Sequence, residues 1–299
     1  MITKFILLRH CTGRSLSSGD ALIVELGTSG FLARVLVNFF QQNMAAPTTR
    51  VAIIGGGEVG TTLALKLHEC TGFEVTIGAR DPARTLGRIA DTIGTHNLVV
   101  PVVRIHEAVA PAQVVILACT GSHDDAGIEA LAASLGDCAT KVVLDATNPF
   151  SEFPEKSCRW GHIRSGGEVL AAALPSSAVY KAFNSVGVEH MKHPEGSALG
   201  GNGGERERED MLVAGDPREP FLDVALAVVT AVGFIPRYVG PIRYARNLEA
   251  IAELWVHLAV PPVGETGVET WGRAWSFKVA GDTGPGYAAG VEPSATLVE

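Results

Sequence analysis

The 299-residue sequence contains few cysteines, and no two of them are close together in the sequence. An odd, scattered set without any C-x-x-C pair is typical of free thiols in a reducing compartment. The free thiols favour a cytoplasmic location. The chain also lacks a run of about 18 apolar residues, so we expect no transmembrane span. The five cysteines are Cys11, Cys70, Cys119, Cys138 and Cys158.

The sequence also has no excess of positive charge. Its formal net charge is -8, and a nucleic-acid surface is therefore not an expected partner. Hydrophobic residues make up 46% of the chain and charged residues 19%, a balance that favours a packed globular protein over a disordered one. No repeat of about 20–50 residues is evident.

Residues 1–50 differ from the rest of the chain. They contain five basic and two acidic side chains, a net charge of +3, which leaves -11 for residues 51–299. This basic, hydroxyl-rich character is typical of an organelle-targeting peptide, which would make the protein organellar. The alternative is an extension that adds nothing to the fold, with Met44 as the natural start. We favour the extension, because the first strand-helix unit begins abruptly at Val51.

Beyond Arg50, short apolar runs alternate with helical stretches, which predicts an α/β fold: a doubly wound, mostly parallel Rossmann sheet with a short C-terminal helical segment. We expect this NADP-binding Rossmann domain over 51–240, the helical segment over 241–280 and a loose tail over 281–299. The expected strands are 51–55, 73–78, 97–103, 112–119, 141–147, 178–183, 211–215 and 234–240, separated by helices that include 58–70, 82–94, 128–136 and 246–260.

The first strand is followed by a G-x-G-x-x-G match, Gly55-Gly56-Gly57-Glu58-Val59-Gly60. A lone match is weak evidence, but this one follows a strand and opens a helix, the context of a dinucleotide site. Gly55 would allow the tight turn, Gly57 the approach of a pyrophosphate, and Gly60 the packing of helix on strand. The free N–H groups of the helix would face the anion. The alternative is a glycine-rich turn without a ligand.

The second strand ends in Gly78-Ala79-Arg80, and Arg80 follows Gly60 by twenty residues. NAD-selective units usually place Asp or Glu here, to bind the ribose 2′-hydroxyl. A guanidinium instead binds a 2′-phosphate, and Arg84 lies one helical turn further on. We therefore predict NADP(H) as the cofactor, with Asp81 as a helix N-cap. Two solvent-facing arginines without a ligand are the alternative.

The sequence lacks an evident catalytic acid or base. It has no Tyr-x-x-x-Lys spacing, and no histidine–carboxylate pair stands out. His123 follows the fourth strand and could contact substrate or nicotinamide, or else lie at a helix start near solvent. Cys119 fits a small packing residue better than a nucleophile. His190 and His193 lack a third ligand nearby, so we interpret them as surface residues and expect no metal site.

Several blocks resemble the NADPH-dependent deazaflavin (coenzyme F-420) reductase family, whose Rossmann domain is shared with pyrroline-5-carboxylate reductases and transmembrane ferric reductases. The resemblance covers about residues 51–280. It implies hydride transfer between nicotinamide and a deazaflavin, flavin or similar small acceptor, with deazaflavin or flavin as the second substrate. The blocks are "VAIIGGGEVGTTLALKL", "VTIGARDP", "LDATNPF", "VYKAFNSVGVEHM", "MLVAGDP" and "GFIPRYVGPIRYARNLE".

The resemblance also assigns residues. It implies that the glycine loop holds the pyrophosphate and that Ala79, Arg80 and Arg84 bind the 2′-phosphate. The segment Cys119–His123, with Thr120, would border the nicotinamide together with Asn148 and Pro149. Asn184 would lie in the same region, so that His123, Asn148 and Asn184 are positioning candidates.

Two features depart from the family pattern: Ala79 replaces a common serine beside the phosphate, and Thr120-Gly121 replaces bulkier residues. An imine or carbonyl reductase of the pyrroline-5-carboxylate reductase kind and a non-catalytic NADP(H) sensor remain alternatives. A homodimer through the apolar C-terminal helix around Trp255 is a further expectation.

Overall fold

The computed structural model describes residues 48–93, 100–152, 157–158, 164–194, 208–260, 271–273 and 275–279, with only the backbone of residues 91–93. The chain divides into two units, Met1–Pro47 and Thr48–Glu299. The first unit and the tail at 281–299 lie outside the described residues. The expectations for both segments, and the predicted domain boundaries, therefore stay predictions.

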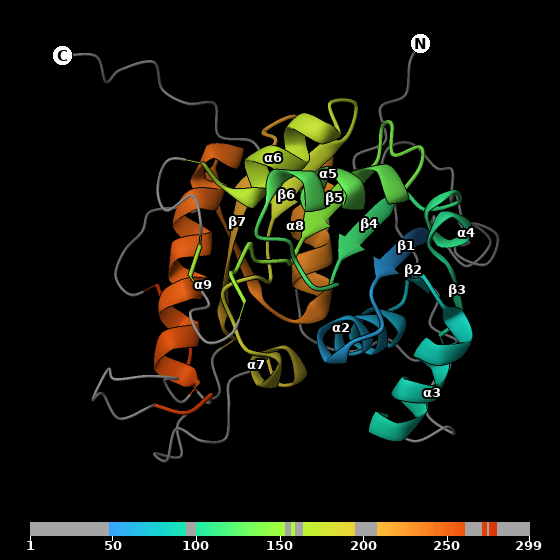
Figure 1. Ribbon diagram of the computed structural model, residues 1–299, viewed down its shortest axis with the longest axis horizontal. Coiled ribbons are helices and arrows are strands. Elements are labelled where there is room, and N and C mark those ends of the chain that lie inside the picture. The colour runs from blue at the N-terminus through green and yellow to red at the C-terminus, as the bar shows by residue number, and fades with distance from the viewer. Residues whose placement is uncertain are drawn as a thin grey trace, which may run out of the picture. The chain divides into compact units, whose positions relative to one another are not determined.

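Eight strands form one sheet in the order β3-β2-β1-β4-β5-β6-β7-β8 (Figure 1). This is the Rossmann order, with the chain leaving β1 in both directions, and it confirms the predicted fold class. The first six strands run parallel: β1 Thr49–Ile54, β2 Phe73–Ala79, β3 Val102–Arg104, β4 Val114–Leu117, β5 Val142–Asp145 and β6 Ala178–Lys181.

The last two strands run the other way. β7 (Asp210–Gly215) is antiparallel to β6, and β8 (Ile235–Gly240) is parallel to β7. A parallel return needs a crossover of about a dozen residues, usually a helix that spans the sheet. The helix after β6, α7 (Val188–Lys192), has only five residues. Because β7 is antiparallel to β6, the chain re-enters the sheet from the edge where β6 ended.

Helices cover both faces of the sheet, and the alternation along β1 shows how. Val51 and Ile53 belong to one buried cluster with residues of α2, α3, α7 and α8, whereas Ala52 and Ile54 belong to a second with residues of α4, α5 and α6. The helices are α2 Glu58–His68, α3 Pro82–Ile93, α4 Ile105–Val109, α5 Asp125–Ser134, α6 Gly166–Ala173, α8 Phe221–Val232, the 3₁₀ helix η1 Ile242–Tyr244 and α9 Ala245–Ala259.

Local sequence signals account for several of these boundaries. Asp81 caps α3 as predicted, because its Oδ1 accepts a hydrogen bond from the N–H of Arg84 at 3.0 Å. Pro82 is the first residue of that helix. Gly136 has a φ of 75° just beyond α5, a conformation that glycine adopts at low cost and that ends the helix.

Helix α9 lies at the end of the sheet opposite β3 and α4 (Figure 1). Its Trp255 is 7% exposed, because the Trp275 ring stacks on it at 6.1 Å between centroids and the Trp275 carbonyl accepts its indole N–H. Trp255 is thus covered by its own chain, and a homodimer through it stays a prediction. Among the described helices, none combines the length and apolar character of a membrane span.

Candidate functional site

The carboxyl ends of β1 and β4 lie next to each other, at the point where the strand order reverses. In open α/β sheets this edge is where ligands bind. β2 and β3 extend the edge on one side, and β5 and β6 extend it on the other. The predicted site residues lie in the turns that follow these strands, so the fold brings them to one edge.

The glycines after β1 pack the turn against the neighbouring strand. Gly55 has a φ of 119°, and a Cβ there would lie 2.7 Å from the Ala118 carbonyl oxygen after β4. A Cβ on Gly60 would collide with the Gly55 carbonyl oxygen, and one on Gly56 with the Thr85 side chain. Gly55 and Gly60 therefore need glycine for the turn and for the packing of α2, whereas a Cβ at Gly56 would require the Thr85 side chain of α3 to move.

Gly57 is different, because a Cβ there would meet nothing within 4 Å. It immediately precedes α2, so its backbone borders open space at a helix N-terminus. Such a terminus presents free N–H groups to an anion. The neighbouring Val59 packs partly on the core, and Glu58 forms an ion pair of 2.6 Å with Lys192 of α7. The open backbone at Gly57 fits the pyrophosphate role predicted for it.

Positive charge gathers at the end of β2. Arg80 and Arg84 are both exposed, and within the part of the chain that the structure describes neither guanidinium forms an ion pair. Asp81 is occupied with capping α3, so its carboxylate does not take the place of the ribose-binding acid. This arrangement fits a ligand with a 2′-phosphate better than one with a 2′-hydroxyl.

A third arginine, Arg104, joins this group and was not predicted. Arg104 ends β3 directly beside Ala79 in the sheet register, and its Nη1 donates to the Arg80 carbonyl oxygen at 3.4 Å. The sequence signal was present, since a basic residue ends a third strand at the same edge. The weak apolar pattern before it left the position of that strand uncertain.

The turn after β4 leads from Cys119 to His123 and packs on the turn after β5. A Cβ on Gly121 would collide with the Asn148 carbonyl oxygen, so glycine is required for these two turns to meet. Thr120 is exposed, and His123 is partly buried just before Asp124, the N-cap of α5. The structure thus brings the Cys119–His123 turn and Asn148 together, as predicted.

Burial raises the pKa of the Cys119 thiol to about 11, and the negative charge of Asp145 adds to this rise. The thiol is therefore protonated near neutral pH and is a poor nucleophile. This agrees with the prediction that Cys119 is a packing residue. The carboxylate of Asp145, at the end of β5, therefore acts electrostatically on the turn after β4.

Two asparagines join the turns after β5 and β6. Asn148 Nδ2 donates to the Asn184 carbonyl oxygen at 2.9 Å, and Asn184 Nδ2 donates to Asn148 Oδ1 at 3.0 Å. Asn184 Nδ2 also donates to the Leu248 carbonyl oxygen of α9 at 3.1 Å. The residue before Asn184, Phe183, has a φ of 63°, a strained conformation for a bulky side chain. Pro149 is buried beside Asn148.

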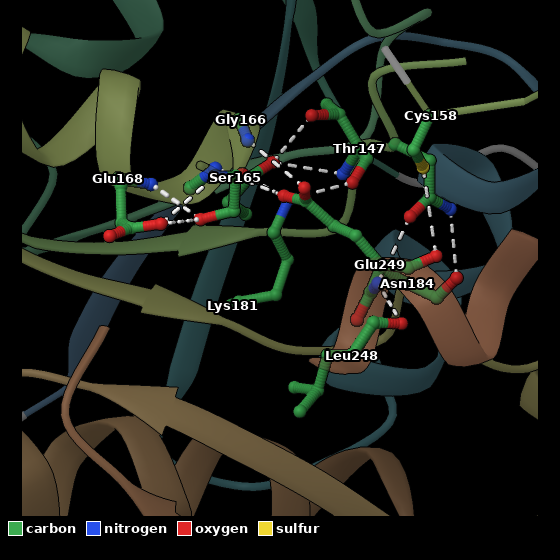
Figure 2. A network of polar contacts seen from close by, with 12 residues as sticks. Thr147, Cys158, Ser165, Gly166, Glu168, Lys181, Asn184, Leu248 and Glu249 are labelled. Carbon is green, nitrogen blue, oxygen red and sulfur yellow. Dashed lines mark hydrogen bonds and ion pairs between the residues drawn. The ribbon is translucent and has the colours of Figure 1, made fainter. Parts of the chain in front are cut away.

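A buried charge cluster lies under these turns, and the sequence analysis missed it (Figure 2). Lys181, the last residue of β6, is 0% exposed and forms ion pairs with Asp145 at 2.6 Å and with Glu249 of α9 at 2.9 Å. Burial alone would lower the pKa of Lys181, but the two carboxylates outweigh it and raise that pKa. A signal existed: Asp145 and Lys181 each end an otherwise apolar strand of the predicted sheet.

The interpretation of His190 as a surface residue is wrong. His190 is 2% exposed, with Nδ1 at 2.8 Å from Glu209 Oε1 and Nε2 at 3.2 Å from the Arg273 carbonyl oxygen. The antiparallel entry of β7, which brings Glu209 back to this edge, buries it. His193 is exposed. Among the described residues, no three His, Cys, Asp or Glu side chains gather as metal ligands.

Comparison with known proteins finds relatives of this chain in sequence and in structure. The rat (Rattus norvegicus) protein "Metalloreductase STEAP3" is 30% identical over 202 residues, which cover 68% of this chain and 36% of that protein. The chain thus spans about a third of the length of this relative.

Two solved structures have a similar fold. A putative F420-dependent NADP reductase from Arthrobacter sp. FB24 shares 25% identity with a TM-score of 0.61, covering 77% of this chain and 98% of its own. The hypothetical protein SMa0349 from Sinorhizobium meliloti shares 24% identity with a TM-score of 0.51, covering 69% of this chain and 89% of its own. The latter shows the fold alone.

Residues 50–149 match the family model described as "NADP oxidoreductase coenzyme F420-dependent". This segment contains the glycine turn, the three arginines and the turns after β4 and β5. The match supports an NADP-dependent oxidoreductase and leaves the acceptor unspecified. The resemblance to the coenzyme F-420-dependent NADP oxidoreductase family is therefore confirmed over residues 50–149.

Proposed function

We propose that the protein is an NADP(H)-dependent oxidoreductase that transfers hydride between nicotinamide and a small ring acceptor, such as a deazaflavin or flavin. The observation that carries the cofactor choice is the group of exposed arginines at the ends of β2 and β3, Arg80 and Arg84 with Arg104; among the described residues, no ion pair occupies the guanidinium of Arg80 or Arg84. In this proposal the open backbone at Gly57 and the N-terminus of α2 hold the pyrophosphate.

The residues on the other side of the edge would orient the nicotinamide half. Polar groups on this side include the backbone of the Cys119–His123 turn and the side chains of Asn148 and Asn184, which hold each other in place by hydrogen bonds. NADP(H), when bound, supplies the hydride chemistry. The protein then contributes position and exclusion of water, the terms that matter most when no group must be protonated by the enzyme.

The charges in these turns support an acceptor that exchanges its own proton with water. Cys119 holds its proton because burial raises the pKa of that thiol to about 11. Lys181 also holds its proton, because Asp145 and Glu249 raise its pKa and occupy its ammonium group. An imine or carbonyl reductase needs a proton donor with a pKa near neutral; neither Cys119 nor Lys181 meets that need, so in these turns the role would fall to His123.

The test is NADPH oxidation by the full chain against a panel of deazaflavin, flavin, quinone and ferric acceptors. Turnover with one ring acceptor well above the others is the expected result. The ferric arm examines the chemistry that the name of the rat relative suggests. Tight NADPH binding without turnover on any acceptor would contradict the enzyme proposal and favour an NADP(H) sensor. Turnover of cyclic imines alone would favour the imine reductase.

A further inference from the structure

Lys181 joins three segments that are distant in the sequence. Its Nζ donates to Asp145 Oδ2 at 2.6 Å and to the Thr147 carbonyl oxygen at 2.9 Å, and it lies 2.9 Å from Glu249 Oε1. An ammonium group has three donors, so these three acceptors satisfy it fully. The side chains of Lys181, Asp145 and Glu249 are 0%, 2% and 3% exposed.

The two carboxylates have further partners that hold them in place. Asp145 Oδ1 accepts from the backbone N–H of Thr147 at 2.9 Å and from its hydroxyl at 2.7 Å. Glu249 accepts from the N–H groups of Gly166 and Gly167 at 3.0 Å each. Glu249 therefore occupies the N-terminus of α6, where an anion is favoured. The cluster links β5, β6, α6 and α9 (Figure 2).

The same cluster holds the turn that borders the proposed nicotinamide side. Thr147, bound through its backbone and its hydroxyl, directly precedes Asn148. Asn148 in turn bonds Asn184, and Asn184 donates to the Leu248 carbonyl next to Glu249. Two neighbouring residues of α9 thus hold the two turns. Glu249 holds the turn after β5 through its ion pair with Lys181, and Leu248 holds the turn after β6 through its hydrogen bond with Asn184.

A buried ion cluster of this kind is a poor source of net stability, because desolvation cancels most of the attraction. Its effect is to define a geometry, since Lys181, Asp145 and Glu249 are each held by two or more partners from different segments. Among the described residues, no hydrogen bond or ion pair joins this cluster to Arg80 or Gly57 on the adenosine side of the edge. The cluster therefore acts on one half of the site.

We propose that Lys181, with Asp145 and Glu249, is a positioning residue that sets the Thr147–Asn148 turn against the nicotinamide ring and leaves the grip on the 2′-phosphate unchanged. This inference rests on the proposed function. Misplacement of such a turn by about 1 Å can lower a rate about a hundredfold. The cluster would then control hydride transfer without contacting the reacting atoms.

The test compares two ligands, NADPH and adenosine 2′,5′-bisphosphate, which has the 2′-phosphate but no nicotinamide. The variant K181M/E249Q removes one positive and one negative charge, so that the cluster keeps its net charge. We expect its Kd for the bisphosphate to stay within about twofold of wild type and its Kd for NADPH to rise at least about fivefold. Its kcat for NADPH oxidation, with the acceptor that wild type turns over fastest, should fall at least about tenfold.

Arg246→Met is the matched control. Arg246 of α9 forms a bidentate pair with Glu168 of α6 at 2.7 Å, so it links the same two helices outside the site. It should change neither the ratio of the two Kd values nor kcat. If K181M/E249Q lost affinity for both ligands by the same factor, or lost affinity for neither, the inference would be overturned. Failure of the wild type to bind the bisphosphate would instead contradict the NADP(H) proposal itself.

Thermal unfolding first establishes that each variant is folded. If K181M/E249Q does not fold, Thr147→Val provides the answer, because it removes the hydroxyl bond to Asp145 and keeps every buried charge and the side-chain shape. It should weaken NADPH and not the bisphosphate, by a smaller factor of about two to three. Identical affinities of Thr147→Val and wild type for NADPH, together with identical kcat, would overturn the inference.

Discussion

The two sides of the ligand edge are built in opposite ways. The side at β1, β2 and β3 is open: Arg80, Arg84 and Arg104 are exposed, and Gly57 borders empty space. The side at β5, β6 and α9 is buried, with Lys181 enclosed between Asp145 and Glu249. An open, charged surface suits the capture of a phosphate, whereas an enclosed, fully bonded cluster suits the fixing of a ring. The contrast suggests that affinity and geometry are controlled separately.

The largest effect is expected on the buried side. Glu249→Ala leaves two helix N–H groups and part of the Lys181 charge unpaired, and it should lower the free energy of unfolding by about 3–5 kcal/mol. Urea unfolding measures this change. Glu129→Ala, on the exposed face of α5, should stay within about 0.5 kcal/mol of wild type. A Glu249→Ala loss no larger than that of the control would show that the cluster is not a unit.

The open side should respond in binding and not in stability. Gly57→Ala adds a Cβ where nothing lies within 4 Å, so the fold tolerates it while the pyrophosphate loses its closest approach. Titration should show NADPH affinity reduced at least about tenfold, or about 1.4 kcal/mol, with an unchanged melting temperature. Gly87→Ala, which also enters open space but on α3, should leave NADPH affinity unchanged. Unaltered binding by Gly57→Ala would remove this residue from the site.

A smaller, pH-dependent effect is expected at His190. Burial opposes its charge, but the contact with Glu209 outweighs burial, and Glu189 and the Arg273 carbonyl add to it, so the folded-state pKa of His190 is raised. The stability from this pair is therefore complete below the unfolded value of about 6.5 and is lost as the pH rises through the raised pKa.

His190→Gln should then cost about 1–3 kcal/mol in urea unfolding at pH 6 and less at pH 9. The exposed His68 provides the control variant His68→Gln, which should show no such slope. A cost for His190→Gln that stays constant or grows with pH would mean that His190 is neutral in the folded protein.

The same contrast explains what the sequence could predict. Gly60, Asp81 and Gly136 act on neighbours within a few residues, and the positive φ of Gly55 is a local property of its turn, so their spacing predicted the cofactor turn, the cap of α3 and the end of α5. Most strands were evident as well, because apolar runs in a parallel sheet are continuous.

The buried side depends on residues far apart in the chain. Lys181 lies 36 residues from Asp145, and Glu249 reaches it only because α9 folds back over α6. The direction of β7, and with it the burial of His190, likewise depends on a connection whose path is tertiary. The local sequence pattern carries no information on such pairings. A charged residue at the end of an apolar strand nevertheless marks a position where a buried ion pair can be expected.

The most direct test of the account is the ratio of the Kd for NADH to the Kd for NADPH, measured by calorimetry on wild type and on Arg80→Asp. Charged hydrogen bonds to the 2′-phosphate are worth about 1.5–3 kcal/mol, so wild type should prefer NADPH by about tenfold to hundredfold. Arg80→Asp should abolish most of that preference while changing NADH affinity little. Equal affinities in the wild type, or equal losses for both nucleotides in the variant, would contradict the assignment of Arg80 to the 2′-phosphate.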